Sequence, residues 1–114
     1  MEKAEKGERL YELTLEQAEE LLDKLPSHTK GQRKEIKRIA AGLQIMQPGE
    51  RLFVHEDVSG DGTHSSLFAW QQVDKNHYNI RMISVELAVA VTRKYLAMKE
   101  IPAIITDVKP NCVA

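Results

Sequence analysis

The stretch HEDVSGDGTHSS, residues 55–66, carries the side chains best suited to chemistry in this sequence. Asp57, Ser59 and Asp61 alternate and a glycine follows at once, which is how the calcium-binding loop of an EF-hand begins. The twelfth position of such a loop is a bidentate glutamate, whereas here it is Phe68. The flanking residues also favour strands, and an EF-hand needs helices. The stretch therefore favours a turn between two strands over a calcium site.

A β-hairpin accounts for the same residues. With residues 60–61 as its two-residue turn, Asp57 faces His64 across the two strands. One face of the hairpin then gathers histidine, aspartate and aromatic side chains: Phe53, His55, Asp57, His64, Phe68 and Trp70. The other face gathers mostly aliphatic side chains: Leu52, Val54, Glu56, Leu67 and Ala69. We expect the aliphatic face to pack on helices, which leaves the aromatic face to be explained.

The aromatic face raises a metal-binding hypothesis. His55, Asp57 and His64 would give two imidazoles and one carboxylate, a ligand set that suits a divalent transition metal. The simpler interpretation is a cross-strand ion pair between Asp57 and His64 at a solvated hairpin tip. Metal binding is therefore kept as an alternative.

The three rings Phe53, Phe68 and Trp70 are the predicted partner-binding residues. They have three interpretations: a second small core under the N-terminal helix, the interface of a homodimer, or a stacking platform for nucleic-acid bases. A stacking platform should have Lys or Arg between the rings, and Arg51 alone qualifies nearby. The pattern therefore favours packing or protein contact over base stacking.

Residues 28–38 carry five positive side chains and one negative, a net of +4. The five are candidate contacts of a nucleic-acid-binding regulator: Lys30, Arg33, Lys34, Lys37 and Arg38. Residues 1–24 carry four positive and eight negative side chains, a net of −4. Mutual neutralisation across a helix pair is the simpler interpretation, and we expect the basic residues to spread around their helix. The net charge of the whole chain, −1, gives no global field that favours nucleic acid.

No motif of enzyme chemistry stands out. The sequence has neither a glycine-rich phosphate loop nor a G-x-S-x-G nucleophile turn. The single cysteine, Cys112, excludes an internal disulfide framework and a cysteine-rich zinc site. We therefore predict a protein without catalytic activity and without a cofactor.

Two helices are predicted first, because Thr14 and Thr29 each precede a glutamine by three residues in the Thr-x-x-Gln capping box. The hairpin follows at about residues 51–58 and 64–73. Ser84 is then predicted to cap a long helix over about residues 84–100. The alternation within residues 85–91 also suits a strand, and that choice stays open.

This order predicts an α+β fold: two N-terminal helices, a hairpin, a long helix and a final short strand at AIITDV. The sheet should be small, mostly antiparallel and packed on the helices. The 114 residues suit a single domain at 13–109. We expect a loosely ordered N-terminus at 1–12 and a C-terminal tail at 110–114.

The first residues lack the apolar region of a secretory signal, and no apolar run reaches the length of a membrane span. We expect a cytoplasmic protein without a membrane partner, acting in the host cytoplasm if it is viral. Its size and lack of catalytic motifs suit a phage or another mobile element. The sequence thus predicts a small regulatory protein that contacts another protein or its own copy, as a homodimer. Nucleic-acid binding through the basic helix is the alternative.

Overall fold

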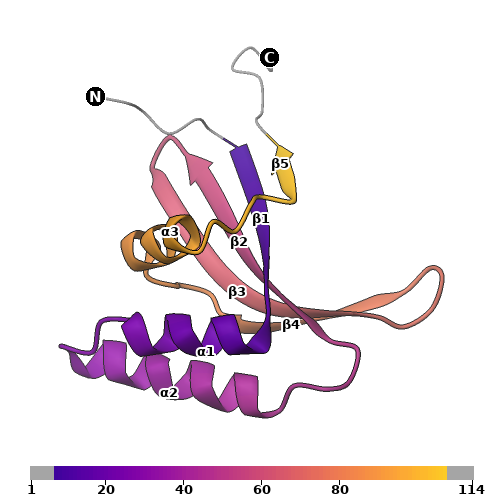
Figure 1. The fold of residues 1–114 in the computed structure, drawn as a ribbon, viewed down its shortest axis with the longest axis horizontal. Helices are drawn as coiled ribbons and strands as arrows, with labels where there is room; N and C mark the ends of the chain where they lie inside the picture. Colours follow the sequence, from indigo (N-terminus) through magenta and orange to yellow (C-terminus); the bar gives the residue numbers. More distant parts are fainter. Residues whose placement is uncertain (1–6, 108–114) are drawn as a thin grey trace.

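The computed structural model describes residues 7–107, which form one sheet and three helices (Figure 1). The elements are, in chain order, β1 (Gly7–Leu13), α1 (Leu15–Lys24), α2 (Lys30–Gln44), β2 (Arg51–Ser59), β3 (Gly62–Gln72), β4 (Tyr78–Ser84), α3 (Val89–Met98) and β5 (Ile105–Asp107). The strands lie in the order β4-β3-β2-β1-β5, and each neighbouring pair is antiparallel. The predicted α+β class is confirmed.

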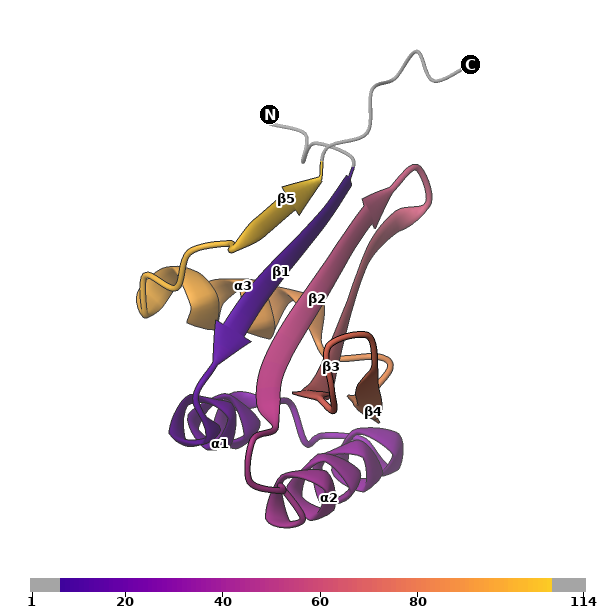
Figure 2. The same ribbon diagram turned by 90° about the vertical axis from the view of Figure 1, so that its right-hand side faces the viewer.

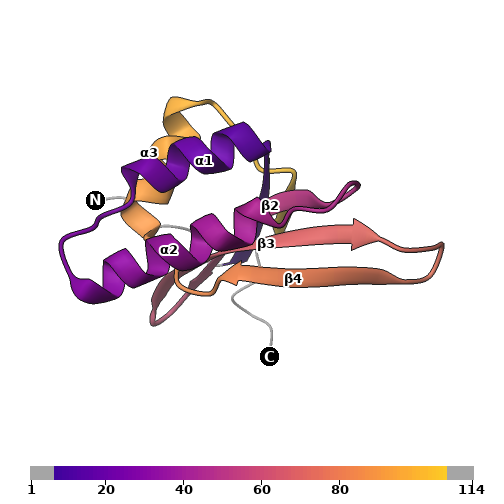
Figure 3. The same ribbon diagram turned by 90° about the horizontal axis from the view of Figure 1, so that it is seen from below.

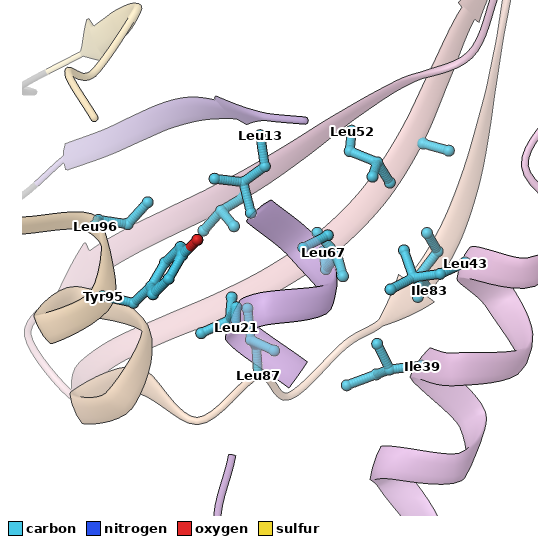
Figure 4. Packing of buried hydrophobic residues seen from close by; sticks show 13 residues of the cluster. Leu13, Leu21, Ile39, Leu43, Leu52, Leu67, Ile83, Leu87, Tyr95 and Leu96 are labelled. Atoms are coloured by element: carbon cyan, nitrogen blue, oxygen red, sulfur yellow. The ribbon is translucent and has the colours of Figure 1, made fainter. Parts of the chain in front are cut away.

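One face of the sheet packs against all three helices (Figures 2 and 4). The strands contribute core residues that share this face by register: Leu13, Leu52, Val54, Leu67, Ala69 and Ile83. The helices contribute Ala18 and Leu21 from α1, Ile39 and Leu43 from α2, and Tyr95 and Leu96 from α3. The aliphatic face of the hairpin is therefore buried under helices, as predicted. We call this side of the sheet the covered face.

The two N-terminal helices begin where the sequence predicts. The Thr14 hydroxyl accepts a hydrogen bond from the backbone N–H of Gln17, whose side chain accepts one in return from the Thr14 backbone. Thr29 and Gln32 repeat this arrangement at the start of α2. Each capping box satisfies backbone donors that have no partner within the helix.

The N-terminal strand was not predicted. Residues 7–12, expected to be loosely ordered, belong to β1, which lies between β2 and β5. Arg9, Tyr11 and Leu13 alternate toward the covered face, so the strand carries a charged residue where a core strand usually carries an aliphatic one. The expectation for residues 1–6 lies outside the described residues.

The predicted long helix over 84–100 is wrong in its first part. Residues up to Ser84 form β4, residues 85–88 connect, and α3 begins at Val89. Ser84 is buried and donates a hydrogen bond to Oε2 of Glu35 at 2.5 Å, so it does not cap the helix. The N-cap of α3 is Ala88, which supplies no side-chain hydrogen bond.

The remaining elements match their predictions closely. The hairpin strands at 51–59 and 62–72 are near the expected bounds, and β5 at 105–107 is the expected short final strand. The predicted tail at 110–114 lies outside the described residues.

Candidate interaction surface

The register of the hairpin is the predicted one. Asp57 pairs with His64, and Phe53 pairs with Phe68. Ser59 pairs with Gly62 at the end of the ladder, which leaves residues 60–61 as the turn. The side chains that the sequence places on the aromatic face therefore share one face of the sheet, opposite the helices.

Four aromatic rings form a continuous row across β2, β3 and β4. The Phe53 and Phe68 rings stack with centroids 5.6 Å apart, and Trp70 meets Phe53 edge-on at 6.5 Å. Tyr78 extends the row, with its ring centroid 6.2 Å from that of Trp70. The guanidinium carbon of Arg51 lies 5.3 Å from the Phe53 centroid and 5.7 Å from that of Trp70, within cation–π range.

Neighbouring strands extend this apolar surface. By register, Ile80 and Met82 of β4 lie beside Trp70 and Phe68, on the same side of the sheet. The apolar side chains on this side line a shallow groove of about 400 Å³ together with Arg51: Leu10, Phe53, Phe68, Trp70, Tyr78, Ile80 and Ile104. We use "open face" for these seven apolar side chains together with Met82.

Within residues 7–107, no helix packs on the open face. Tyr78, Ile80 and Met82 are 58%, 51% and 50% exposed, and Ile104 is 51% exposed. Phe53 is 5% exposed because the neighbouring rings and Arg51 cover it. The interpretation of the rings as a core under the N-terminal helix is therefore wrong, since α1 packs on the covered face.

Charged groups flank the open face on the β1 side. Glu12 accepts two hydrogen bonds from Arg51, at 2.8 and 2.9 Å, and these bonds lower the pKa of the Glu12 carboxyl. Nε2 of His55 lies 2.9 Å from a carboxylate oxygen of Glu8. Asp57 lies beside Glu8 by register, so three carboxylates are spread along the β1–β2 side of the face. Any partner of the surface meets negative charge here.

The metal hypothesis gains no support from the geometry. Asp57 and His64 face each other across the hairpin, but His55 is engaged with Glu8 instead. Among residues 7–107, no group of three histidine, cysteine, aspartate or glutamate side chains is arranged to hold a metal ion. The three predicted ligands therefore share a face without forming a ligand cluster.

The basic residues of α2 do line one side of the helix, against expectation. Lys30, Arg33, Lys34, Lys37 and Arg38 are all exposed. At 3.6 residues per turn they fall within an arc of about 140° on the side away from buried Ile39 and Leu43. We call these five residues the basic strip.

The acidic helix α1 does not neutralise the basic strip. Among the described residues, no ion pair joins α1 to α2, and Glu20 of α1 instead pairs with Lys99 of α3 at 3.2 Å. Within the strip, Arg38 approaches Glu35 at 3.8 Å, and Arg33 donates to the backbone carbonyls of the preceding loop. The strip therefore presents a surplus of positive charge to solvent.

One polar cluster on the covered face was missed by sequence reasoning. Glu56, 3% exposed, lies between Arg93 of α3, whose Nε is 2.9 Å away, and Arg9 of β1, at 3.4 Å. The hydrogen bond to Glu56 raises the pKa of Arg93, and burial, followed by the Glu56 charge, raises that of Tyr11. These side chains line a hollow of about 300 Å³ with Leu96, Ala97 and Ile101. The two guanidiniums compensate the charge of the buried carboxylate.

Neither a family model, nor a curated protein, nor a solved structure matches this chain. Within residues 7–107, no helix has the length and apolar character needed to cross a membrane. In the described part of the chain, the open face is apolar and the basic strip is cationic, and both differ from an ordinary mixed surface.

Proposed function

We propose that this chain is a small non-catalytic protein that acts by binding another protein through its open face. The observation that carries this proposal is a continuous apolar surface on a sheet side without helices, hollowed by a groove with an aromatic floor. A contiguous apolar surface of this kind costs free energy in water and is typical of an interaction site.

The charge around the open face supports a protein partner over nucleic acid. Stacking surfaces for bases combine aromatic rings with cations that attract phosphates. Here Arg51 is neutralised by Glu12, and Glu8 and Asp57 add negative charge farther along the same two strands, β1 and β2. A phosphate backbone following the rings toward β1 would meet these carboxylates.

The proposal is tested by capture from a cell lysate with matched variants. Ile80 and Ile45 are both isoleucines, 51% and 57% exposed, but Ile80 lies on the open face and Ile45 is the C-cap residue of α2. Ile80→Ser should reduce the captured partner at least tenfold, and Ile45→Ser should leave capture unchanged. Equal capture by both variants would place the contact elsewhere.

The basic strip favours a second candidate function, contact with a polyanion such as a nucleic-acid backbone. Its five cations are exposed along one side of a 15-residue helix. Binding of this kind should weaken steeply with salt, because each phosphate contact releases a counterion. A Lys34→Gln, Lys37→Gln double variant should lower affinity for duplex or single-stranded oligonucleotides at low salt, whereas Lys94→Gln on α3 should not. No binding by the unaltered chain at low salt would remove this candidate.

A further inference from the structure

We infer that the protein that covers the open face is a second copy of this chain, in a two-fold symmetric dimer. This inference rests on the proposed function, because it names the partner of the same surface. In a two-fold dimer one patch meets itself, so the patch must tolerate its own charge and fit its own shape.

The apolar end of the open face tolerates its own copy. On this side of the sheet, from Phe68 onward, β3 contributes Phe68, Trp70 and Gln72, and β4 contributes Tyr78, Ile80 and Met82. None of these side chains carries a charge at neutral pH. The carboxylates Glu8 and Glu12 lie on β1, two strands from β3, and Asp57 lies on β2 beside His64, four residues along β3 from Phe68. A two-fold axis near β3 at the level of Phe68 and Trp70 therefore sets uncharged side chains against each other, and the adjacent cation, Arg51 on β2, is paired with Glu12.

The relief of the open face is self-complementary. Phe53, Phe68 and Trp70 form the floor of the groove, on the central strands β2 and β3. Tyr78 and Ile80 stand at one wall, and on the edge strand β4 they are far more exposed than Phe53. A two-fold axis that runs parallel to β3 between the two sheets would set the β4 ridge of each copy over the groove of the other. This keeps the strands of the two sheets aligned, as in ordinary sheet-on-sheet packing.

The area of the open face suits a dimer. If a fully exposed side chain of this size presents about 200 Å², the four half-exposed side chains Tyr78, Ile80, Met82 and Ile104 offer roughly 400 Å². The partly exposed Leu10, Phe68 and Trp70 and the polar rim add to this. The apolar side chains thus offer about half to three quarters of the roughly 800 Å² that each partner contributes to a standard interface, and the polar rim would supply the remainder.

The outer part of the β3–β4 ribbon gives a second reason for a covering layer. Figures 1 and 3 show the ends of these strands and their connecting loop extending beyond the three helices. A two-stranded ribbon with solvent on both sides is marginally stable in water. Tyr78 lies on the part of this ribbon beyond β2, next to Trp70, so a contact that buries the rings also supports the ribbon.

The test is sedimentation velocity on the full chain over a wide concentration range. The unaltered chain should reach twice its 12.9 kDa mass. Ile80→Ser and Met82→Ser should each raise the dimer dissociation constant at least tenfold, whereas Ile45→Ser should change it less than twofold. Trp70 is the only tryptophan, so its emission should shift to shorter wavelength as the dimer forms, and this shift should be lost in the two open-face variants.

Each outcome decides something. A chain that stays at 12.9 kDa at every concentration overturns the dimer. If lysate capture then still depends on Ile80, the proposed function stands and another protein occupies the face; if it does not, both proposals fail. A dimer that persists unchanged in both open-face variants overturns this surface as the interface. Because Ile80 and Met82 are half exposed, both variants should fold, which far-UV circular dichroism checks.

Discussion

The two sides of the sheet are made by the same strands, but they differ in what covers them and in their expected roles. Along β2 and β3, alternate residues are mostly aliphatic and buried under helices, while the residues between them are mostly aromatic or polar and have no helix of residues 7–107 packed on them. We expect the covered face to supply most of the free energy of folding. Apart from the packing among its own rings, the open face should contribute little to it. Substitution of a side chain that faces the helices should therefore alter stability, whereas substitution of an exposed side chain on the other side should alter association.

The polar groups differ in the same way. On the covered face, the buried Glu56 carboxylate is held between two guanidiniums. On the open side, Glu12 and Arg51 form a pair with good geometry, but both side chains remain substantially exposed to water. When one partner is removed, the charge left behind is solvated by water in the exposed pair and poorly solvated in the buried cluster.

The largest expected difference is between Leu67→Ala and Ile80→Ser. Leu67 is 1% exposed in the centre of the core (Figure 4), so its truncation should lower the free energy of unfolding by about 2–5 kcal/mol. Ile80→Ser should change it by less than about 0.5 kcal/mol, measured by urea unfolding at a concentration where the chain is monomeric. Comparable losses from both variants would mean that the two faces contribute alike to folding.

Next in size is the contrast between the two carboxylates. Glu56→Gln removes the charge that compensates Arg9 and Arg93, and because these side chains are 20% and 41% exposed, it should destabilise the fold by about 1–3 kcal/mol. Glu12→Gln breaks an exposed pair and should cost less than about 1 kcal/mol. The same urea titration measures both variants. A neutral Glu56→Gln would show that water already solvates this cluster.

A smaller effect is expected where α2 approaches the covered face. A Cβ at Gly42 would lie 3.0 Å from Cγ2 of Ile83, so Gly42→Ala requires the Ile83 side chain or the helix to shift by a few tenths of an ångström. This packing loss should outweigh the helix propensity gained from alanine, for a net destabilisation of about 1 kcal/mol. Gly31, near the other end of α2, has only the Thr29 hydroxyl oxygen near its virtual Cβ, at 3.9 Å. Gly31→Ala should therefore stabilise by about 0.5–1 kcal/mol, and thermal melts of the pair test the sign of each.

The parts of the fold that the sequence predicts are those set by local signals. The Thr-x-x-Gln boxes and the alternation around the hairpin determine two helices and a register without any distant contact. Strand β1 could not be predicted this way, because Arg9 on its core side is compensated by Glu56, 47 residues away. Ser84 was mistaken for a cap for the same reason, since its partner Glu35 is 49 residues away.

The candidate surfaces were predictable to different extents. The three central rings follow from the hairpin register alone, but Tyr78, Ile80 and Met82 join them only once β4 is placed beside β3. The basic strip, by contrast, was present in the sequence as cations spaced i, i+3, i+4, i+7 and i+8, which is the pattern of one helix face. The prediction that these cations spread around the helix was therefore wrong, and a helical projection of the sequence alone would have corrected it.

The smallest predicted effect concerns acid stability. Arg81 donates hydrogen bonds to Glu50 at 3.0 and 3.2 Å, and these lower the pKa of Glu50, as Arg51 lowers that of Glu12. Because the folded-state pKa lies below the unfolded value of 4.5, each pair stabilises the fold above that pH and loses its contribution as the pH falls through the folded-state pKa. Glu50→Gln should flatten the decline of stability below pH 5 more than Glu12→Gln, since the Glu50 side chain is 9% exposed and Glu12 37%. Urea midpoints measured from pH 7 to pH 3 test this order, and an equal effect of the two variants would show that burial of the pair makes no difference.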